Sequence, residues 1–345
     1  MTTPPNILLR HRLEESAAQC GFIACGMTPA APLAAWRQEA VRRWLDAGRA
    51  AEMDYLHRHF ALRCDPRLVE PSVRTVVSVA LPYDMQPSFA PDALRLSRYA
   101  LGDDYHDVVK ERLRRMVRLL GYDPSTDGRI CCDTAPVDER YWAWRTGVGD
   151  WLRSGLIAVR GHGTCVLLGE WLSPIPMAPA EAAKDVVPPA LPAEGCLTCR
   201  RCVAACPGGA LDGEGLDARR CLSYLTIEHR GSLPNNDDHT PARRAALARC
   251  FYGCDRCAEV CPHNAHPLPS EAIPPELRPR PTLLNRNAEE WQAMTVETYR
   301  ELFRRSAVKR AKFEGLKRNL QASSGAEEDD VENSHHFDGS RTPKC

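Results

Sequence analysis

The sequence predicts a mixed helix-and-strand fold, α+β or α/β in class, followed by a cysteine-rich module and by helices at the C-terminal end. Three observations support this prediction. In the first half, segments with helical spacing alternate with short β-branched, apolar segments. Cysteines then recur at close spacing between residues 196 and 261. Beyond residue 289 the helical spacing returns.

Two helical segments are expected at the N-terminal end. Residues 6–25 are expected to form a helix that ends in a turn. Residues 32–60 are rich in Ala, Arg and Leu with helical spacing, and Trp36 and Trp44 follow that spacing into the expected core. Pro66 ends the pattern, because proline disfavours helix at the residue before it.

A buried strand and an amphipathic helix are expected next. Residues 75–81 are β-branched and apolar, which is typical of a buried strand. Residues 103–120 carry apolar residues on one helix face, with Asp103 or Asp104 as the N-cap and Gly121 placed to end the helix. The expected inner face consists of Val108, Leu113, Val117 and Leu120.

An acidic residue follows the next expected strand. Residues 129–137 read as a strand that runs into a loop, and Asp133 then lies at the strand end, where α/β folds present catalytic groups. A turn aspartate is the alternative. Residues 139–146 are expected to be helical. The short apolar segments 155–159 and 164–168, with glycines between them, are expected to form a hairpin.

The cysteine-rich module carries the most specific motif. Residues 196–207 have the spacing C-x2-C-x2-C-x3-C-P, and residues 254–262 repeat its second half. In two-cluster ferredoxins the cysteine before proline binds the other cluster, so two such runs predict two [4Fe–4S] clusters. The runs supply seven of the eight thiolates, and Cys221 or Cys250 must supply the eighth. A zinc site or a disulfide framework gives no reason for this spacing.

Length, composition and charge limit the classes of protein. The chain has 345 residues, enough for two or three domains. Its net charge is zero and its pI is about 7.1, so any nucleic-acid surface must be local. No apolar run approaches the ~18 residues of a membrane span, and no signal peptide is recognisable. A cytoplasmic protein with reduced thiols and no membrane contact is therefore expected.

The composition also divides the chain into four parts. The expected parts are an N-terminal domain at 1–185, a cluster domain at 186–275, a helical segment at 276–321 and a disordered tail at 322–345. The first boundary falls in a proline-rich stretch, which is typical of a linker. The tail is polar with almost no large apolar residue.

Between and after the cysteine runs, further helices are expected. Residues 216–228 read as a helical insert that is followed by a polar loop at 232–240, and residues 289–319 read as helix. The stretch 300–318 carries eight basic residues against two glutamates. Such a run indicates either a solvated helix face or a face that contacts phosphates.

Several stretches outside the cysteine runs are specific when they are taken together. They are residues 97–100, 104–110, 133–140, 168–170, 216–228, 252–257 and 313–320. With the cysteine runs they resemble the epoxyqueuosine reductase family, cobalamin-dependent iron–sulfur enzymes of tRNA queuosine synthesis. The resemblance covers about residues 50–320.

The resemblance implies a fold and a reaction. An N-terminal α/β domain would bind cobalamin against a ferredoxin-like double-cluster domain, and electrons would pass through the clusters to cobalamin to reduce the epoxide of the wobble nucleotide. The residue that matches the family's proton donor is Asp133. An acid that protonates a leaving oxygen must hold its proton near neutral pH, so partial burial and a raised pKa are expected for Asp133.

The resemblance also assigns residues to the cofactors. It places Cys196, Cys199, Cys202 and Cys261 on one cluster and Cys206, Cys221, Cys254 and Cys257 on the other, so it favours Cys221 over Cys250 as the eighth ligand. The residues that match cobalamin-site positions, or are candidates for contact with it, are Arg63, Tyr105, His106, Asp133, Ser223 and Asp255. The implied partners are the anticodon loop of a tRNA and an external one-electron donor such as flavodoxin or ferredoxin, and the protein is expected to be a monomer.

One stretch departs from the family. Residues 147–155 lack the apolar-Gly-Lys ending that lies near cobalamin in the family, which puts cofactor contact or substrate fit in question. Two alternatives therefore stay open: another corrinoid-dependent reductase, such as a reductive dehalogenase or a corrinoid activator, and a non-enzymatic iron–sulfur electron-transfer subunit. No G-x-G-x-x-G motif follows a strand, so neither NAD nor flavin has a Rossmann signature.

Overall fold

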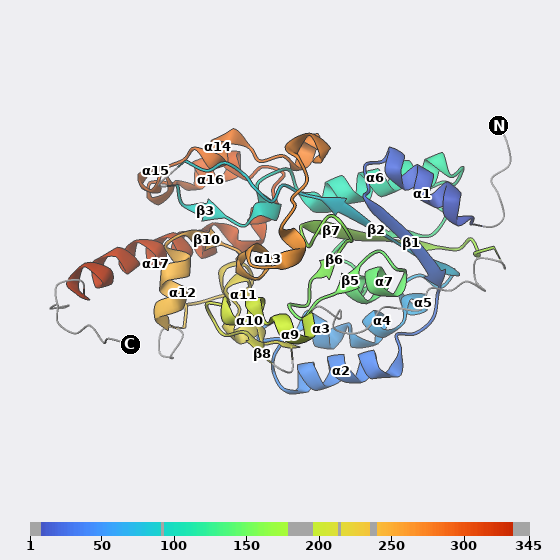
Figure 1. Ribbon diagram of the computed structural model, residues 1–345, viewed down its shortest axis with the longest axis horizontal. Coiled ribbons are helices and arrows are strands. Elements are labelled where there is room, and N and C mark those ends of the chain that lie inside the picture. Colours follow the sequence, from blue (N-terminus) through green and yellow to red (C-terminus); the bar gives the residue numbers. More distant parts are fainter. Residues whose placement is uncertain (1–7, 91–92, 179–195, 213–214, 235–239, 334–345) are drawn as a thin grey trace, which may run out of the picture.

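The computed structural model describes residues 8–90, 93–178, 196–212, 215–234 and 240–333. A four-stranded sheet forms the centre of the N-terminal part, with the strand order β1-β2-β7-β4 (Figure 1). Its strands are β1 (Ala24–Pro29), β2 (Thr75–Pro82), β4 (Arg129–Cys131) and β7 (Val166–Ser173). All three pairings are antiparallel. The predicted mixed class is therefore confirmed, and its form is α+β.

Helices cover both faces of this sheet. The first face carries Val77, Val79 and Trp171 and packs against α1 (Arg10–Gln19) and α6 (Tyr105–Leu119). The opposite face packs against α7 (Glu139–Arg145) and also carries Ser78 and Glu170 as register partners. Polar groups are thus enclosed beneath α7.

The predicted strand and the predicted amphipathic helix are both confirmed. The strand of residues 75–81 is β2, which is buried along its whole length. Asp104 is the N-cap of α6 and accepts a hydrogen bond from the His106 N–H at 3.1 Å. All four residues of the predicted inner face are buried, and Gly121 ends the helix with φ +94°.

The expected helices at 6–25 and 32–60 are wrong in their extents. Helix α1 ends at Gln19, and β1 follows because its backbone pairs with β2. The second segment divides into short helices: α2 (Ala35–Asp46), α3 (Tyr55–Arg58), α4 (Phe60–Cys64) and, after the extended Asp65, α5 (Pro66–Val69). Trp36 is 46 % exposed and does not belong to the core, whereas the Trp44 indole N–H donates to the Leu216 carbonyl.

The expected hairpin of residues 155–159 and 164–168 is also wrong. Instead, β6 (Ile157–Ala158) pairs with β5 (Asp150–Trp151), and the later segment joins the main sheet as β7. A single bridge between Val159 and Gly163 connects the two. Long-range pairing with β2 decides the position of β7, and spacing along the sequence does not show it.

The cysteine-rich region consists of short elements. They are α9 (Cys196–Cys199), α10 (Arg201–Ala204), β8 (Leu211–Asp212), β9 (Gly215–Leu216), η2 (Ala218–Arg220), α11 (Leu222–Ile227), α12 (Thr240–Leu247), β10 (Cys250–Tyr252), α13 (Arg256–Glu259) and η3 (Pro262–Asn264). The expected insert at 216–228 is helical from η2 through α11. The expected linker falls mostly in 179–195 and the polar loop mostly in 235–239, outside the described residues.

Helices that follow the cysteine region form a separate core at one end of the molecule, away from the sheet (Figure 1). They are α14 (Pro281–Leu284), α15 (Ala288–Gln292), α16 (Val296–Leu302), η6 (Ala307–Ala311) and α17 (Lys312–Asn333). The preceding η4 (Ser270–Ala272) and η5 (Pro275–Leu277) pack instead on the sheet core through Ile273 and Leu277. Strand β3 (Arg95–Leu96), followed by η1 (Arg98–Ala100), leaves the N-terminal half and pairs with β10 in this core.

The expected boundaries are only partly tested by this arrangement. The helix expected over 289–319 is interrupted twice, and α17 continues through Asn333 into the stretch expected to be disordered. The domain limits themselves stay a prediction. None of the helices in the described residues is long and apolar enough to cross a membrane.

Candidate active site and cysteine groups

Asp133 lies in the loop between β4 and α7. Its backbone has φ +57°, in the left-handed region that costs about 1–3 kcal/mol for a residue other than glycine. The Asp133 N–H donates to the Glu139 Oε1 atom and holds this conformation. The side chain is 60 % exposed, and its Oδ2 atom lies 3.1 Å from the His106 Nε2 atom. The loop thus presents the carboxylate to solvent beside an imidazole.

His106 bridges two carboxylates. Its Nδ1 atom lies 2.6 Å from Asp104 Oδ1, opposite the contact with Asp133. Burial lowers the pKa of His106. The hydrogen bonds to Asp104 and Asp133 and the charges of these carboxylates raise it by more, so that it reaches about 9. Tyr105 stacks on the ring with centroids 4.0 Å apart. At neutral pH the site therefore holds a proton on this imidazole.

The expectation of a raised pKa for Asp133 is wrong. Burial raises the pKa of Asp133, but hydrogen bonds from His106 and Tyr105 and the charges of His106 and Arg140 lower it by more. The resemblance indicated Asp133, but only the fold shows that His106 lies against it and decides its protonation. The carboxyl with a raised pKa is Glu139, at about 8, because of burial and of the charge on Asp133.

Further charged residues surround the Asp133 site. Arg63 donates from Nη1 to the Val137 carbonyl at 3.2 Å, and its Nε atom is buried without a partner. Tyr55 lies below the Arg310 guanidinium, which is 5.9 Å from the ring centroid. Arg310 also makes a bidentate pair with Glu228, at 2.7 and 2.6 Å.

These additional residues were accessible only in part from the sequence. Glu139 and Arg140 stand in the family-like stretch 133–140, and Arg310 stands in the basic run 300–318. No spacing rule connects any of them with Asp133. No motif or spacing in the sequence pointed to Tyr55 as a residue of this site.

One group of cysteines gathers Cys196, Cys199, Cys202 and Cys261. Burial raises the pKa of the Cys261 thiol, and the other three thiols raise it further. Burial also raises the pKa of the Cys202 thiol, and the charges of Cys196 and Cys199 raise it further. The cysteine that precedes the second Pro therefore lies with the first three cysteines of the first run, as a two-cluster ferredoxin module requires.

The other group gathers Cys206, Cys221, Cys254 and Cys257. Burial raises the pKa of the Cys257 thiol, and the charges of Cys221 and Cys206 raise it further; the Cys254 thiol is affected in the same way by Cys250, Cys257 and Cys221. Among the described residues, no three His, Cys, Asp or Glu side chains are arranged to hold one metal ion. The thiolates of a cubane bind different iron atoms, so this finding concerns single-ion sites only.

Cys250 lies beside the second group but its thiol is engaged elsewhere. Its Sγ atom is 3.3 Å from the Tyr252 carbonyl and 3.9 Å from the Gly253 carbonyl. Burial raises its pKa to about 12. Since both Cys250 and Cys221 affect the pKa of the Cys254 thiol, the eighth ligand stays a prediction, with Cys221 as the candidate that the resemblance favours.

Arg140 connects the Asp133 site with the second cysteine group. Its positive charge lowers the pKa of Asp133 and also that of the Cys221 thiol. Ser223 lies two residues after Cys221, and its backbone N–H bonds to that thiol. The Asp133 site and one cysteine group therefore flank the same arginine.

Asp255 is not brought to the Asp133 site by direct contact. It accepts hydrogen bonds from the Ser97 hydroxyl at 2.5 Å and from the Arg98 N–H at 2.9 Å. Burial raises its pKa. These bonds join the segment after β3 to the second cysteine run.

The stretch 147–155, which departs from the family, contacts the first cysteine group. Leu152 packs with Cys196 and Cys261, and the Arg153 Nε–H donates to the Cys196 carbonyl at 3.1 Å. In this protein the stretch therefore packs against the first cysteine group and helps to hold it in place.

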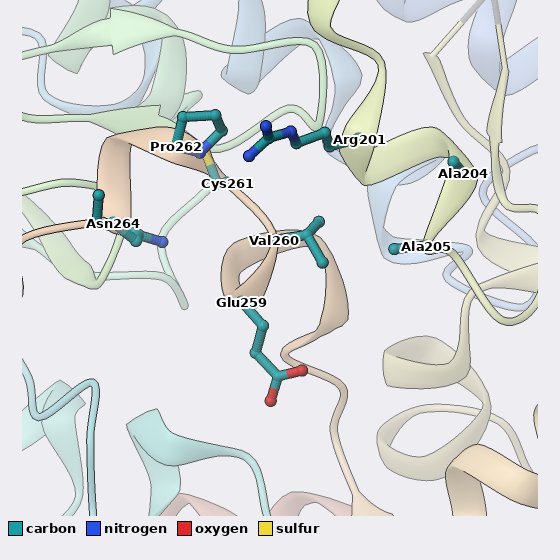
Figure 2. Close-up of a pocket in the computed structure, with 9 residues that line it drawn as sticks. Arg201, Ala204, Ala205, Glu259, Val260, Cys261, Pro262 and Asn264 are labelled. Atoms are coloured by element: carbon teal, nitrogen blue, oxygen red, sulfur yellow. The ribbon is translucent and has the colours of Figure 1, made fainter.

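A hollow of about 630 Å³ opens beside the same group (Figure 2). Residues of α10, of α13 and of η3 line it. Arg201 extends across it toward Cys261 and Pro262 (Figure 2). Surface access to the first group is thus lined mainly by small and apolar residues and one arginine.

Comparisons with known proteins give a consistent result. A family model described as epoxyqueuosine reductase QueG, DUF1730, matches residues 63–134, and a model of a 4Fe–4S double cluster binding domain matches residues 195–264. An epoxyqueuosine reductase of Cyclobacterium marinum is 34 % identical over 89 % of this chain and 94 % of its own length. One of Synechococcus sp. (strain CC9605) is 36 % identical over 91 % and 94 %.

Solved structures agree with these relatives. An epoxyqueuosine reductase crystallised with an epoxyqueuosine-modified tRNA-Tyr stem loop has a TM-score of 0.76 at 26 % identity, over 93 % of this chain and 82 % of that one. A Bacillus subtilis epoxyqueuosine reductase, solved with its catalytic aspartate loop swung out of the active site, has a TM-score of 0.72 at 25 % identity, over 95 % and 85 %.

Proposed function

Because the chain belongs to the epoxyqueuosine reductase family, we propose that it reduces epoxyqueuosine to queuosine at the wobble position of tRNA. It is then an oxidoreductase, and the reaction removes the epoxide oxygen as water with two electrons and two protons. The observation that carries the proposal is the position of Arg140, between an acid site and a cysteine group. Electron supply and proton supply thus meet at one place.

Two [4Fe–4S] clusters are the electron carriers that fit the cysteines. The double-cluster domain match and the gathering of the thiols around Cys261 and around Cys257 support this assignment. Arg140 lies near the group that contains Cys221, and the surface hollow lies beside the group that contains Cys261. Electrons are therefore proposed to enter at the Cys261 group and leave from the Cys221 group.

Cobalamin is the proposed acceptor of these electrons. The buried Nε–H of Arg63 has no partner among the described residues, and the Asp133 carboxylate is open to solvent, so a polar cofactor would find a donor and an accessible site here. Arg63, Tyr105, His106 and Asp133 would line it, with Ser223 and Asp255 further away. When bound, cobalamin would supply the strong reductant for opening the epoxide.

The proton for the leaving oxygen is held by the pair of His106 and Asp133. His106 Nε2–H donates to Asp133 Oδ2, and Asp104 holds the opposite ring nitrogen and so fixes the orientation of the imidazole. The proton on His106 Nε2 moves to Asp133 Oδ2, and Asp133 passes a proton on to the leaving oxygen. This relay explains how an aspartate with a low pKa donates a proton at neutral pH.

A local basic surface fits the proposed tRNA substrate. Arg304, Arg305, Lys309, Arg310 and Lys312 are exposed on η6 and at its two ends. Arg310 is near enough for Asp133 to affect its pKa. Lys317 and Arg318, by contrast, bond to backbone carbonyls and hold the fold. Part of the basic run is thus available for phosphates beside the acid site.

Metal content and turnover test the proposed function. Anaerobic purification with added cobalamin is expected to give roughly eight iron atoms and one cobalt per chain. The protein should then convert epoxyqueuosine in a tRNA stem loop. Full iron with no retained cobalt and no turnover would instead favour an electron-transfer subunit. Retained cobalt without turnover on this tRNA would favour another corrinoid-dependent reductase.

The proposed external donor is an acidic one-electron carrier protein such as flavodoxin or ferredoxin. Arg201 is exposed and lines the hollow beside the Cys261 group, and its positive charge complements an acidic carrier. Reversing the charge with Arg201→Glu is expected to raise the KM for an acidic flavodoxin about tenfold. The rate with dithionite, which needs no docking, should stay unchanged.

The matched control for this prediction is Arg115→Glu, an exposed residue on α6 that does not line the hollow. It changes the net charge equally and should leave the KM for flavodoxin as it is. Equal KM values for the two variants would remove the hollow as the docking place. A parallel loss with dithionite would mean that Arg201 serves the cluster rather than the carrier.

A further inference from the structure

The Asp133 loop rests on two glutamates that face each other beneath α7. Glu139 is at the first position of α7, and Glu170 is on β7 with no exposed surface. Their carboxyl groups are within hydrogen-bonding range of each other. Neither oxygen of Glu170 receives a hydrogen bond from any described residue. Since two ionised carboxylates are only acceptors, this contact requires a proton between them.

The surroundings of Glu170 give it no other donor. Ser78 is its register partner on β2, and the Ser78 hydroxyl has no partner either. Cys131 is its register partner on β4. Burial without a counter-charge makes full ionisation of both glutamates costly.

Glu139 connects this enclosed pair with the catalytic loop. Its Oε1 atom accepts the Asp133 N–H at the position where the backbone has φ +57°. The strained conformation persists only if something holds it, and this hydrogen bond is a direct tie to α7. The protonation of the pair is therefore coupled to the Asp133 backbone.

We propose that Glu139 and Glu170 share one proton and act as a positioning pair, which latches the Asp133 loop in the conformation that presents its carboxylate to the substrate. Loss of the shared proton places a second negative charge in the pair, repels Glu139 from Glu170 and releases the loop. The structure with a swung-out loop in a Bacillus subtilis relative shows that such a loop has a second position in that protein. Only the catalytic consequence of the latch rests on the proposed function.

The charges around the pair set the pH at which it opens. Burial raises the pKa of Glu139 to about 8, and it also raises that of Glu170 well above its ordinary value. The groups that face the pair are Arg63, Asp133, Asp138 and Arg140, with the thiols of Cys131 and Cys132 and, behind them, Lys110. The thiols stay neutral because burial raises their pKa.

The sign of the pH effect follows from these shifts. A folded-state pKa above the usual 4.5 of a glutamate means that the folded protein binds the proton more tightly than the unfolded chain. The resulting stability is fully present below the unfolded pKa and is lost as the pH rises through about 8. The latch should therefore hold at pH 6.5 and weaken by pH 9.

The rate of amide hydrogen exchange in peptides that cover residues 131–137 measures how firmly the loop is held. The measurement uses the cluster-loaded protein without substrate. In the wild type, exchange corrected for its intrinsic pH dependence should accelerate about tenfold between pH 6.5 and 9. Glu139→Gln keeps an acceptor oxygen but cannot ionise, so its peptides should stay protected at both values. Glu139→Met removes the acceptor, and its peptides should exchange at least tenfold faster at both values.

Two results would overturn the proposal. Protection in Glu139→Met equal to the wild type would show that the hydrogen bond does not hold the loop. An alkaline acceleration in Glu139→Gln or Glu170→Gln as large as in the wild type would show that the shared proton is not the trigger. Since exchange needs no turnover, these results stand apart from the test of the proposed reaction.

Discussion

Asp133→Asn is expected to lower the single-turnover rate of epoxyqueuosine reduction about 10²–10⁴-fold, which is the range for removal of a positioned general acid. The amide keeps the size of the side chain and its contact with His106, whose Nε2 atom lies 3.1 Å from Asp133 Oδ2 in the native protein. It cannot pass a proton to the leaving oxygen. Iron content and binding of the tRNA stem loop should remain unchanged, so the loss should lie in the rate.

The control for this variant is Asp107→Asn, one residue after His106 on an exposed face of α6. It removes an equal charge at the start of the same helix without touching the acid site, and its rate should match the wild type. The His106–Asp133 relay adds a second expectation. The pKa of His106, about 9 in the native protein, should fall when the Asp133 charge is removed, and this is measurable by its NMR titration. A normal rate in Asp133→Asn would remove Asp133 from the reaction.

The acid site shows how far the sequence alone can go. Resemblance placed Asp133, Tyr105 and His106 together, and the structure brings all three into contact. Their charges were not predictable. The proton on His106 depends on Asp104, which the sequence offered only as a helix cap. Pairwise electrostatics depends on distances that the chain order does not contain.

The fold was predictable where a signal is local. The strand β2 and the inner face of α6 follow from apolar periodicity, and the cap at Asp104 follows from a single residue type. Strand β1 and the separation of β6 and β7 into different sheets depend on pairing between distant strands. The sequence patterns predicted neither of them. The same limit applies to Glu170, because its contact with Glu139 joins residues from a strand and a helix that only the packed sheet brings together.

The cysteine spacing predicted seven cluster ligands but left the eighth open between Cys221 and Cys250. Both thiols affect the pKa of Cys254, while only Cys221 is among the thiols that affect Cys257, so Cys221 stays the predicted ligand. Spacing could not decide this, since about thirty residues separate the two candidates and both precede the second run.

Cys221→Ser is therefore expected to lose one [4Fe–4S] cluster, about half of the iron, together with all electron transfer to substrate. A serine oxygen is a poor substitute for a thiolate, and loss of the cluster nearest Arg140 interrupts the proposed path at its last step. Iron analysis and the absorbance of anaerobically purified protein measure the loss, while the remaining cluster should still bleach with dithionite.

Cys250→Ser is the matched variant, because it makes the same substitution at a part-buried thiol beside the same group. It should keep full iron content and nearly full rate, at the cost of a modest loss in stability from its altered contacts with the Tyr252 and Gly253 carbonyls. The reverse result, full iron in Cys221→Ser and half in Cys250→Ser, would exchange the two ligands. The cluster would then lie on the β10 side, away from Arg140, and the proposed route of electrons to the Asp133 site would have to be drawn through the Cys261 group instead.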